Sequence, residues 1–313
     1  MISIIMDVIL TAGRAAIELA LFVLLPVMVF MLCLMRLLEA KGVLDMLVSR
    51  LTPVVRPFGL TGLGVFAALQ ISFVSFAAPI ATLTMMEQRG ASNRHLAATL
   101  AMVFAMSQAN TSLPLTALGL HLGPTLLFSL ISGLVAAAAT CYGFGRNLSV
   151  EEHLSNETLK HSSAEGTKGI LDTINRAGAE AFKIAIGAIP LLVLSLVLVT
   201  ALRQAGIVDA LTHGLAPLLG QLSIDPALIL PTVVKYLAGG TALLGTLDEL
   251  MRQGSFTVDL LNQSAGFLIN PLDLPGVAIL ISSGPRVAQV WKPAALGACV
   301  GIAVNGFSRL LCL

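Results

Sequence analysis

Residues 59–87 read GLTGLGVFAALQISFVSFAAPIATLTMME, and this apolar run decides how the chain is arranged. A single membrane span takes about 20 residues, so the run is long enough to cross once. Its middle, SFVSFAAP (72–79), carries two serines and a proline. Each half is only about 13 residues, roughly 20 Å of helix, which reaches the middle of a bilayer without crossing it. The run is therefore either one crossing or a hairpin that enters and leaves on one side.

The chain contains this organisation twice. Pro26 and Pro190 lie 164 residues apart, as do Gly42 and Gly206, and after a slip of three residues the correspondence resumes at Pro114 and Pro275. The counterpart of residues 72–79 is KYLAGGTA (235–242). A doubled hydrophobic unit with helix breakers at matching places is typical of secondary transporters, whose binding sites lie between the copies.

Composition places the chain in a membrane. Hydrophobic residues make up 56%, charged residues 11%, and the mean hydropathy is +0.91, which leaves too little polar surface to cover a water-soluble globule. The net charge of +1 and the absence of a basic, aromatic-rich patch argue against nucleic-acid binding. Nucleotide-binding and hydrolase motifs are also missing from the sequence, so we expect no enzyme activity, no cofactor and no metal centre.

The distribution of lysine and arginine favours hairpins over spans. If residues 59–87 and the matching region around 235–242 are both hairpins, one membrane face collects thirteen of these residues and the other four, with Lys235 left inside the membrane. Positive residues concentrate in short cytoplasmic loops. With two full spans instead, the split is ten against seven. The bias predicts a multi-pass plasma-membrane protein with both termini outside.

The expected fold is therefore an all-α membrane protein of two inverted repeats, residues 1–145 and 176–313. Each repeat would hold three transmembrane helices, one re-entrant helical hairpin and one interfacial amphipathic helix, at 43–57 and 207–219. Residues 146–175 are the only long polar stretch and read as a cytoplasmic linker. Residues 1–13 read as interfacial.

Lys235 is the strongest single indication of a binding site in the sequence. An ammonium group at the middle of a membrane costs about 2.5 to 3.5 kcal/mol on insertion scales, so water or a partner must offset it. One interpretation is a charge that attracts an anionic or polar solute beside Gly239, Gly240 and Thr241, where a half-helix begins. The other is a structural ion pair or a side chain that reaches the surface.

Polar residues at the other helix breaks complete the candidate site. The first hairpin supplies Gln70, Ser72 and Ser75, although serine in a membrane helix often bonds its own backbone. Two proline-containing breaks, SQANTSLP (107–114) and INPLDLP (269–275), free backbone groups that only protein or a wet cavity satisfies. They carry Gln108, Asn110, Asn270 and Asp273, which alternatively cap helix ends. A buried Asp273 would need Lys235 or a cation as its partner.

Two pairs of segments resemble known families. GLTGLGVFAALQISFVSFAAPIATLTMMEQRG (59–90) with MSQANTSLPLTALGLHLG (106–123) resembles spore maturation protein A. LPTVVKYLAGGTALLGTLDELMRQGSF (230–256) with GFLINPLDLPGVAILISSG (266–284) resembles spore maturation protein B. The chain is thus similar to a fusion of the two, within the nucleoside recognition (Gate) superfamily. That superfamily is associated with concentrative nucleoside transporters and with the membrane pore of bacterial ferrous-iron transporters.

Two functions follow from these observations. The first is a secondary carrier of a small polar or anionic solute, for which the resemblance suggests a nucleoside, with H+ or Na+ as the coupling ion. The second is a membrane assembly protein that transports nothing, in line with the morphogenetic role of the spore maturation proteins. In both cases membrane lipid surrounds the chain, and a homo-oligomer is compatible with the sequence.

Overall fold

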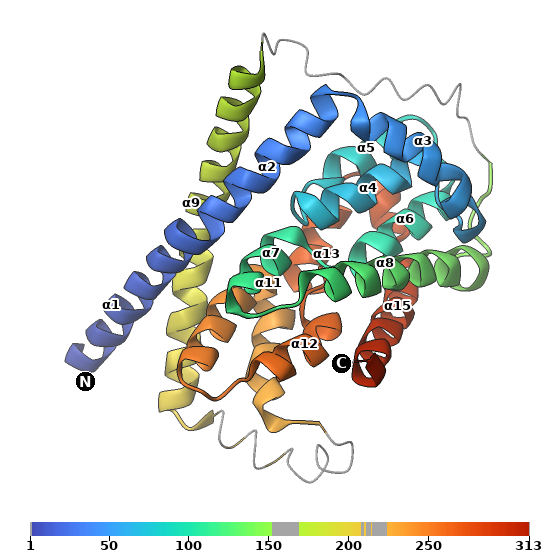
Figure 1. The fold of residues 1–313 in the computed structure, drawn as a ribbon. Helices are drawn as coiled ribbons and strands as arrows, with labels where there is room; N and C mark the ends of the chain where they lie inside the picture. Colours follow the sequence, from blue (N-terminus) through green and yellow to red (C-terminus); the bar gives the residue numbers. More distant parts are fainter. Residues whose placement is uncertain (1, 152–168, 208–209, 211–213, 215–223, 313) are drawn as a thin grey trace.

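We describe a computed structural model of the chain that covers residues 2–151, 169–207, 210, 214 and 224–312. All regular structure in these residues is helical, and no strand occurs among them. Figure 1 shows long helices on two sides of the molecule with shorter, interrupted helices between them. The polar stretch at 152–168 and most of the amphipathic segment at 207–219 lie outside the described residues.

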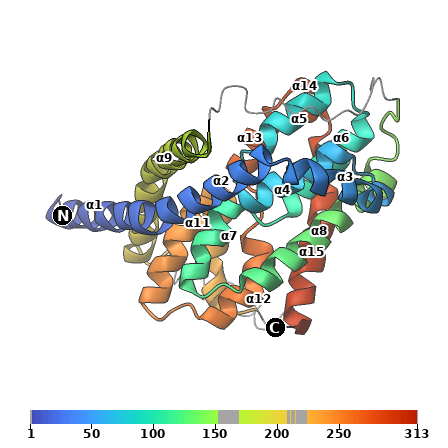
Figure 2. The same cartoon turned by 45° about the horizontal axis from the view of Figure 1, so that its top comes forward.

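One side of the molecule is built by two long helical rods. The first is α1 (Ile2–Glu18), a π-helical segment (Leu19–Leu24) and α2 (Leu25–Ala40), and the second is α9 (Ile170–Gln204). Figures 1 and 2 show them together, with the start of α1 projecting beyond the other helices. Three buried alanines of α9, one helical turn apart, pack against Leu24, Met28 and Leu32: Ala177, Ala181 and Ala185. Small residues let helices approach closely in lipid.

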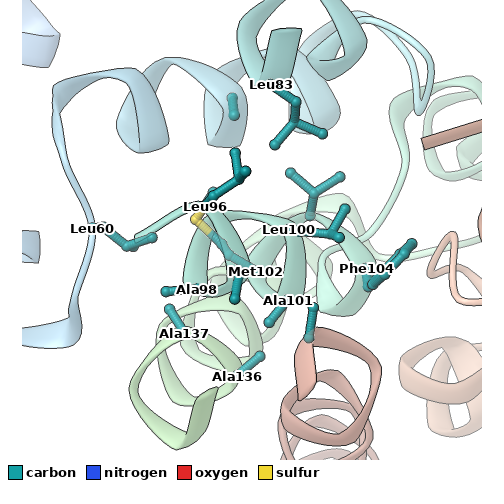
Figure 3. Packing of buried hydrophobic residues seen from close by; sticks show 14 of the residues in the cluster. Leu60, Leu83, Leu96, Ala98, Leu100, Ala101, Met102, Phe104, Ala136 and Ala137 are labelled. Carbon is teal, nitrogen blue, oxygen red and sulfur yellow. The ribbon is translucent and has the colours of Figure 1, made fainter. Parts of the chain in front are cut away.

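The opposite side is a bundle of α6 (Asn93–Ala105), α8 (Leu122–Ala138), which continues as a π-helical segment (Ala139–Phe144), and α15 (Trp291–Cys312). Gly297 and Gly301 of α15 face Thr140 and Ser132 of the neighbouring helix so closely that an added Cβ would overlap them. The main apolar cluster fills the space beside this bundle. Figure 3 shows the leucine side chains of α6 pointing at Leu83 and the alanines of α8 on the other side.

Short helices occupy the middle. They are α3 (Val43–Val55), α4 (Gly62–Phe73), α5 (Pro79–Gln88), α7 (Ala109–Leu115), α12 (Val258–Leu268), α13 (Leu274–Ile281) and α14 (Pro285–Gln289). Single 3-10 turns lie at Arg56–Phe58, Thr116–Leu118 and Pro226–Leu228. The longest central element, α11 (Ile229–Arg252), contains a non-helical residue at Gly239. The amphipathic segment predicted at 43–57 is therefore helical, and it meets α4 at 104°.

Five helices in the described chain are long and apolar enough to cross a membrane: Ile9–Ala40, Leu122–Phe144, Ile170–Leu198, Pro226–Arg252 and Trp291–Cys312. Counting the bent pair 43–73 as one span gives six. The structure confirms an all-helical, multi-pass protein, and it corrects one expectation in detail. Residues 9–13 belong to the first long helix and are not a separate interfacial segment. The chain is non-helical at 106–108 and at 269–273, within or next to the breaks predicted at 107–114 and 269–275.

Candidate functional site

The interval between α4 and α5 is the first helix break. The backbone carbonyl of Gln70 accepts hydrogen bonds from the amides of Val74 and Ser75, at 2.9 and 3.1 Å, which ends α4. The Thr82 hydroxyl of α5 donates to Gln70 Oε1 at 2.7 Å and so ties the two helices together. At the tip, the amide of Phe76 donates to Asn110 Oδ1 at 3.3 Å. This break therefore contacts the next break along the chain.

The second break, between α6 and α7, connects to the third. Gln108 is buried in extended conformation, and its amide donates to the carbonyl of Ile269 at 3.0 Å. Its side-chain Nε2 donates to the carbonyl of Asn270 at 3.3 Å. The amide of Ser107 donates to the hydroxyl of Ser129 at 2.7 Å. The amides of Ser107 and Gln108 are thus paired within the protein, as a membrane interior requires.

The third break, between α12 and α13, is held by its own polar side chains. Asn270 Nδ2 donates to the carbonyls of Gly266 and Phe267, at 3.3 and 2.9 Å, and its Oδ1 accepts from the amide of Leu272 at 3.1 Å. Asp273 is the N-cap of α13, and its Oδ1 accepts from the amide of Gly276 at 2.7 Å. The capping role considered for both residues is present in the structure, and neither one excludes a second role.

Lys235 and Asp273 form a buried ion pair. Lys235 Nζ lies 2.5 Å from Asp273 Oδ2, and the two side chains are 0% and 2% exposed. The Tyr236 ring also lies near, with its centroid 5.1 Å from Nζ. Because the desolvation of both charges offsets most of their attraction, such a pair adds little stability by itself, but it leaves no net charge. The ammonium is therefore already neutralised by a side chain of the third break.

Gly239 breaks α11 at the place where it meets the other breaks. Its φ of 86° and ψ of 179° belong to a region that essentially only glycine adopts. A Cβ at Gly239 would lie 2.9 Å from Pro275 Cγ, and one at Gly240 would overlap the side chains of Gln108 and Thr111. Because both residues are glycines and have no side chain, α11 can contact α7 and α13.

Contacts link six of the eleven predicted site residues: Lys235, Gly239, Gly240, Gln108, Asn270 and Asp273. Asn110, two residues after Gln108, bonds to the Phe76 amide of the first break. Gln70 bonds to Thr82 instead. Within the described chain, Ser72, Ser75 and Thr241 show no hydrogen bond from their side chains to this group.

Sequence reasoning missed Thr111 and Ser112, whose buried hydroxyl oxygens have no hydrogen-bond partner in the structure. Both follow Asn110 directly in α7, just after the second break, and Thr111 faces Gly240. A hydroxyl that is buried without a partner is costly and calls for an explanation. Their position inside the break predicted at 107–114 was the signal that could have identified them.

A cavity of about 350 Å³ lies between α2 and α9 on one side and α4 and α5 on the other. Gln70 and Thr82 line it together with apolar residues such as Phe66. At its rim Arg36 binds two carboxylates, Glu39 at 3.1 Å and Glu180 at 3.0 Å. The cavity therefore runs along the first break, and neither Lys235 nor Asp273 is among the residues that line it.

Comparisons with known proteins agree with this architecture. Residues 21–124 match the family model for Gate, nucleoside recognition. The structure is similar to that of CNTnw, a concentrative nucleoside transporter, in an inward-facing substrate-bound state, with a TM-score of 0.70 at 17% identity, covering 93% of this chain and 74% of that one. The structure of a CNTnw variant in an outward-facing state matches with a TM-score of 0.65, at the same identity and coverage. No curated protein sequence matches the chain. At this identity the likeness establishes a shared fold.

Proposed function

We propose that this protein is a membrane transporter that moves a small polar solute through the site where its helix breaks meet. The observation that carries the proposal is the fully buried Lys235–Asp273 pair, which joins α11 to the break before α13. Ionisable residues inside a membrane protein are costly, and they mark solute and ion pathways. The Gate match and the CNTnw-like fold support the same function.

The charge of the site favours a neutral or zwitterionic solute over an anion. Lys235 was the candidate for attracting an anion, but Asp273 already balances its charge. What the cluster offers instead are amides and hydroxyls, from Gln108, Thr111 and Ser112. Such groups bind uncharged hydroxyl, amide and ring-nitrogen groups. A nucleoside has this chemistry, and the family description and the fold support it as the first compound to test.

The proposal includes a coupling ion, H+ or Na+. Breaks in a membrane helix expose carbonyl oxygens, and discontinuous helices of transporters use such carbonyls to coordinate cations. Asp273 is the acidic residue of the cluster, and its Oδ2 is held by Lys235. A coupling cation would therefore either compete with Lys235 for the Asp273 carboxylate or bind only carbonyl and amide oxygens.

The proposal also includes the arrangement in the membrane. Residues 1–145 and 176–313 would be inverted repeats in the plasma membrane, with re-entrant hairpins at α4–α5 and at α11, both termini outside and residues 146–175 cytoplasmic. The thirteen-to-four distribution of lysine and arginine supports this orientation. Single cysteines at the exposed residues Pro57 and Gln88, in a variant without the native cysteines, test it with impermeant thiol reagents. Labelling from opposite sides of the membrane would refute the first hairpin.

Uptake into proteoliposomes tests the transport function. The purified protein is assayed with radiolabelled nucleosides, amino acids and carboxylates, each with and without a Na+ or proton gradient. A substrate should accumulate with the parent protein and fail to do so with Lys235→Met. A matched control is Arg252→Gln, since the Arg252 side chain is 61% exposed and pairs with Asp248 at 2.9 Å.

The double variant Lys235→Met/Asp273→Asn separates a folding defect from a functional one. It removes both buried charges, so it should fold as well as the parent while remaining inactive. No uptake of any compound by a well-folded parent protein would refute the transporter proposal. That result would favour the assembly function that the resemblance to the spore maturation proteins suggests.

A further inference from the structure

Arg309, in the last turn of α15, is fully buried and is the largest side chain in the described chain with no exposed surface. Its Nε donates to Asn305 Oδ1 at 2.9 Å, and its Nη1 donates to the carbonyl of Asn262 at 2.7 Å. The guanidinium carbon lies 5.6 Å from the centre of the Phe128 ring. All three neighbours are uncharged, so none of them cancels the positive charge.

Among the residues that the structure describes, the guanidinium therefore finds neither a counter-charge nor an acceptor for its last donor. Within the described residues no carboxylate pairs with Arg309, and its Nη2 has no partner. Buried charges in proteins are paired or coordinated, because an isolated one is very costly. A ring face contributes only a fraction of what an anion would. Lys235, the other fully buried cation, has its carboxylate, and this contrast makes Arg309 exceptional.

A second donor without an acceptor lies on the neighbouring helix. The hydroxyl of Thr125 in α8 is buried and unpaired, and Thr125 precedes Phe128 by three residues, so both lie on adjacent positions of one helix face. Asn262 links the same elements, since its Oδ1 accepts from the amide of His121 at 2.7 Å at the start of α8. The first turn of α8, α12 and the last turn of α15 are thus linked through Asn262 and Phe128, and α8 and α15 each carry one free donor.

We propose that Arg309 Nη2 and the Thr125 hydroxyl bind a small inorganic anion, of which chloride is the representative. A bound water would accept hydrogen bonds from these donors, but it would leave the charge uncancelled. Complete burial of Arg309 favours a monatomic anion over a lipid phosphate or an organic acid. The anion joins α8, α12 and α15, and it lies outside the Lys235–Asp273 cluster, so the inference is independent of the transport proposal.

Thermal unfolding of the purified full chain tests the site. Melting temperatures are compared in sodium chloride, sodium bromide and sodium gluconate at equal ionic strength. Chloride and bromide should raise the melting temperature in a saturable way, by about 2 to 4 °C over gluconate. Arg309→Gln should abolish the difference, and Thr125→Val should weaken the apparent chloride affinity several-fold. The matched control, Arg252→Gln, removes an exposed arginine and should keep the full response.

Equal melting temperatures in the three salts would overturn the proposal, as would a chloride response that persists in Arg309→Gln. If Arg309→Gln does not fold, crystals of the parent grown in bromide decide the matter by anomalous scattering. A bromide peak within hydrogen-bond distance of Arg309 Nη2 supports the site. A water molecule there, with no anomalous signal, refutes it.

Discussion

Asp273→Asn is the most informative single change, because it removes one charge of the buried pair and leaves nearly everything else in place. Asparagine has the same shape and still caps α13, where Asp273 Oδ1 accepts from the Gly276 amide at 2.7 Å. The ammonium of Lys235, 0% exposed, loses its counter-charge. Breaking a buried ion pair from one side costs about 3 to 5 kcal/mol.

At about 2 °C per kcal/mol for a chain of this size, the melting temperature should fall by about 6 to 10 °C. The assay is thermal unfolding in one detergent, with the double variant Lys235→Met/Asp273→Asn beside it. The double variant should recover most of the loss, since it buries no unpaired charge. Asp248→Asn is the control, because its partner Arg252 is 61% exposed and such pairs contribute about 0 to 1 kcal/mol. If the melting temperatures of Asp273→Asn and Asp248→Asn fall by the same small amount, the buried-pair reasoning is wrong.

Three further changes test other parts of the structure. Gly239→Ala should cost about 1 to 3 kcal/mol in unfolding free energy and reduce transport, since alanine is strained at φ 86° and its Cβ would crowd Pro275; normal stability and uptake would contradict the break geometry. Gly301→Ala should destabilise by about 1 to 3 kcal/mol because it overfills the contact of α15 with α8, whereas Gly123→Ala, in open space, should be neutral or stabilising in the same melt. Ser129→Ala should cost about 1 to 3 kcal/mol by orphaning the buried Ser107 amide, and hydrogen exchange at that amide should accelerate; unchanged exchange would count against the bond.

Helix breaks were the part of the structure that local sequence predicts best. Proline removes an amide donor, and Asn and Asp cap helices, so 107–114 and 269–275 could be identified as interruptions from their composition alone. The pairing of Lys235 with Asp273 was one of two alternatives, because charge balance requires a partner but does not say which one. To choose between the two alternatives one must know how α11 is rotated relative to α13. That rotation depends on packing across the whole core, which the local sequence does not give.

Contacts that depend on helix orientation were not predictable. Gln70 was assigned to the site, but its side-chain oxygen accepts the Thr82 hydroxyl, since α4 and α5 place these two residues face to face. Arg309 was counted among the four basic residues of the outer face, because a single arginine near a helix end in a membrane usually reaches the surface. Its burial follows from the close approach of α15 to α12, where Asn305 Oδ1 would meet a Cβ at Gly266 at 2.8 Å.

The neutrality of the Lys235–Asp273 pair has a consequence for the energetics of any motion of the site. Membrane potential does about 2.3 kcal/mol of work on each elementary charge per 100 mV. Opposite charges held 2.5 Å apart carry almost no net charge through that field when they move together. Voltage would therefore leave the movement of this site nearly unaffected, and any electrogenic current would have to be carried by the ions that accompany the solute.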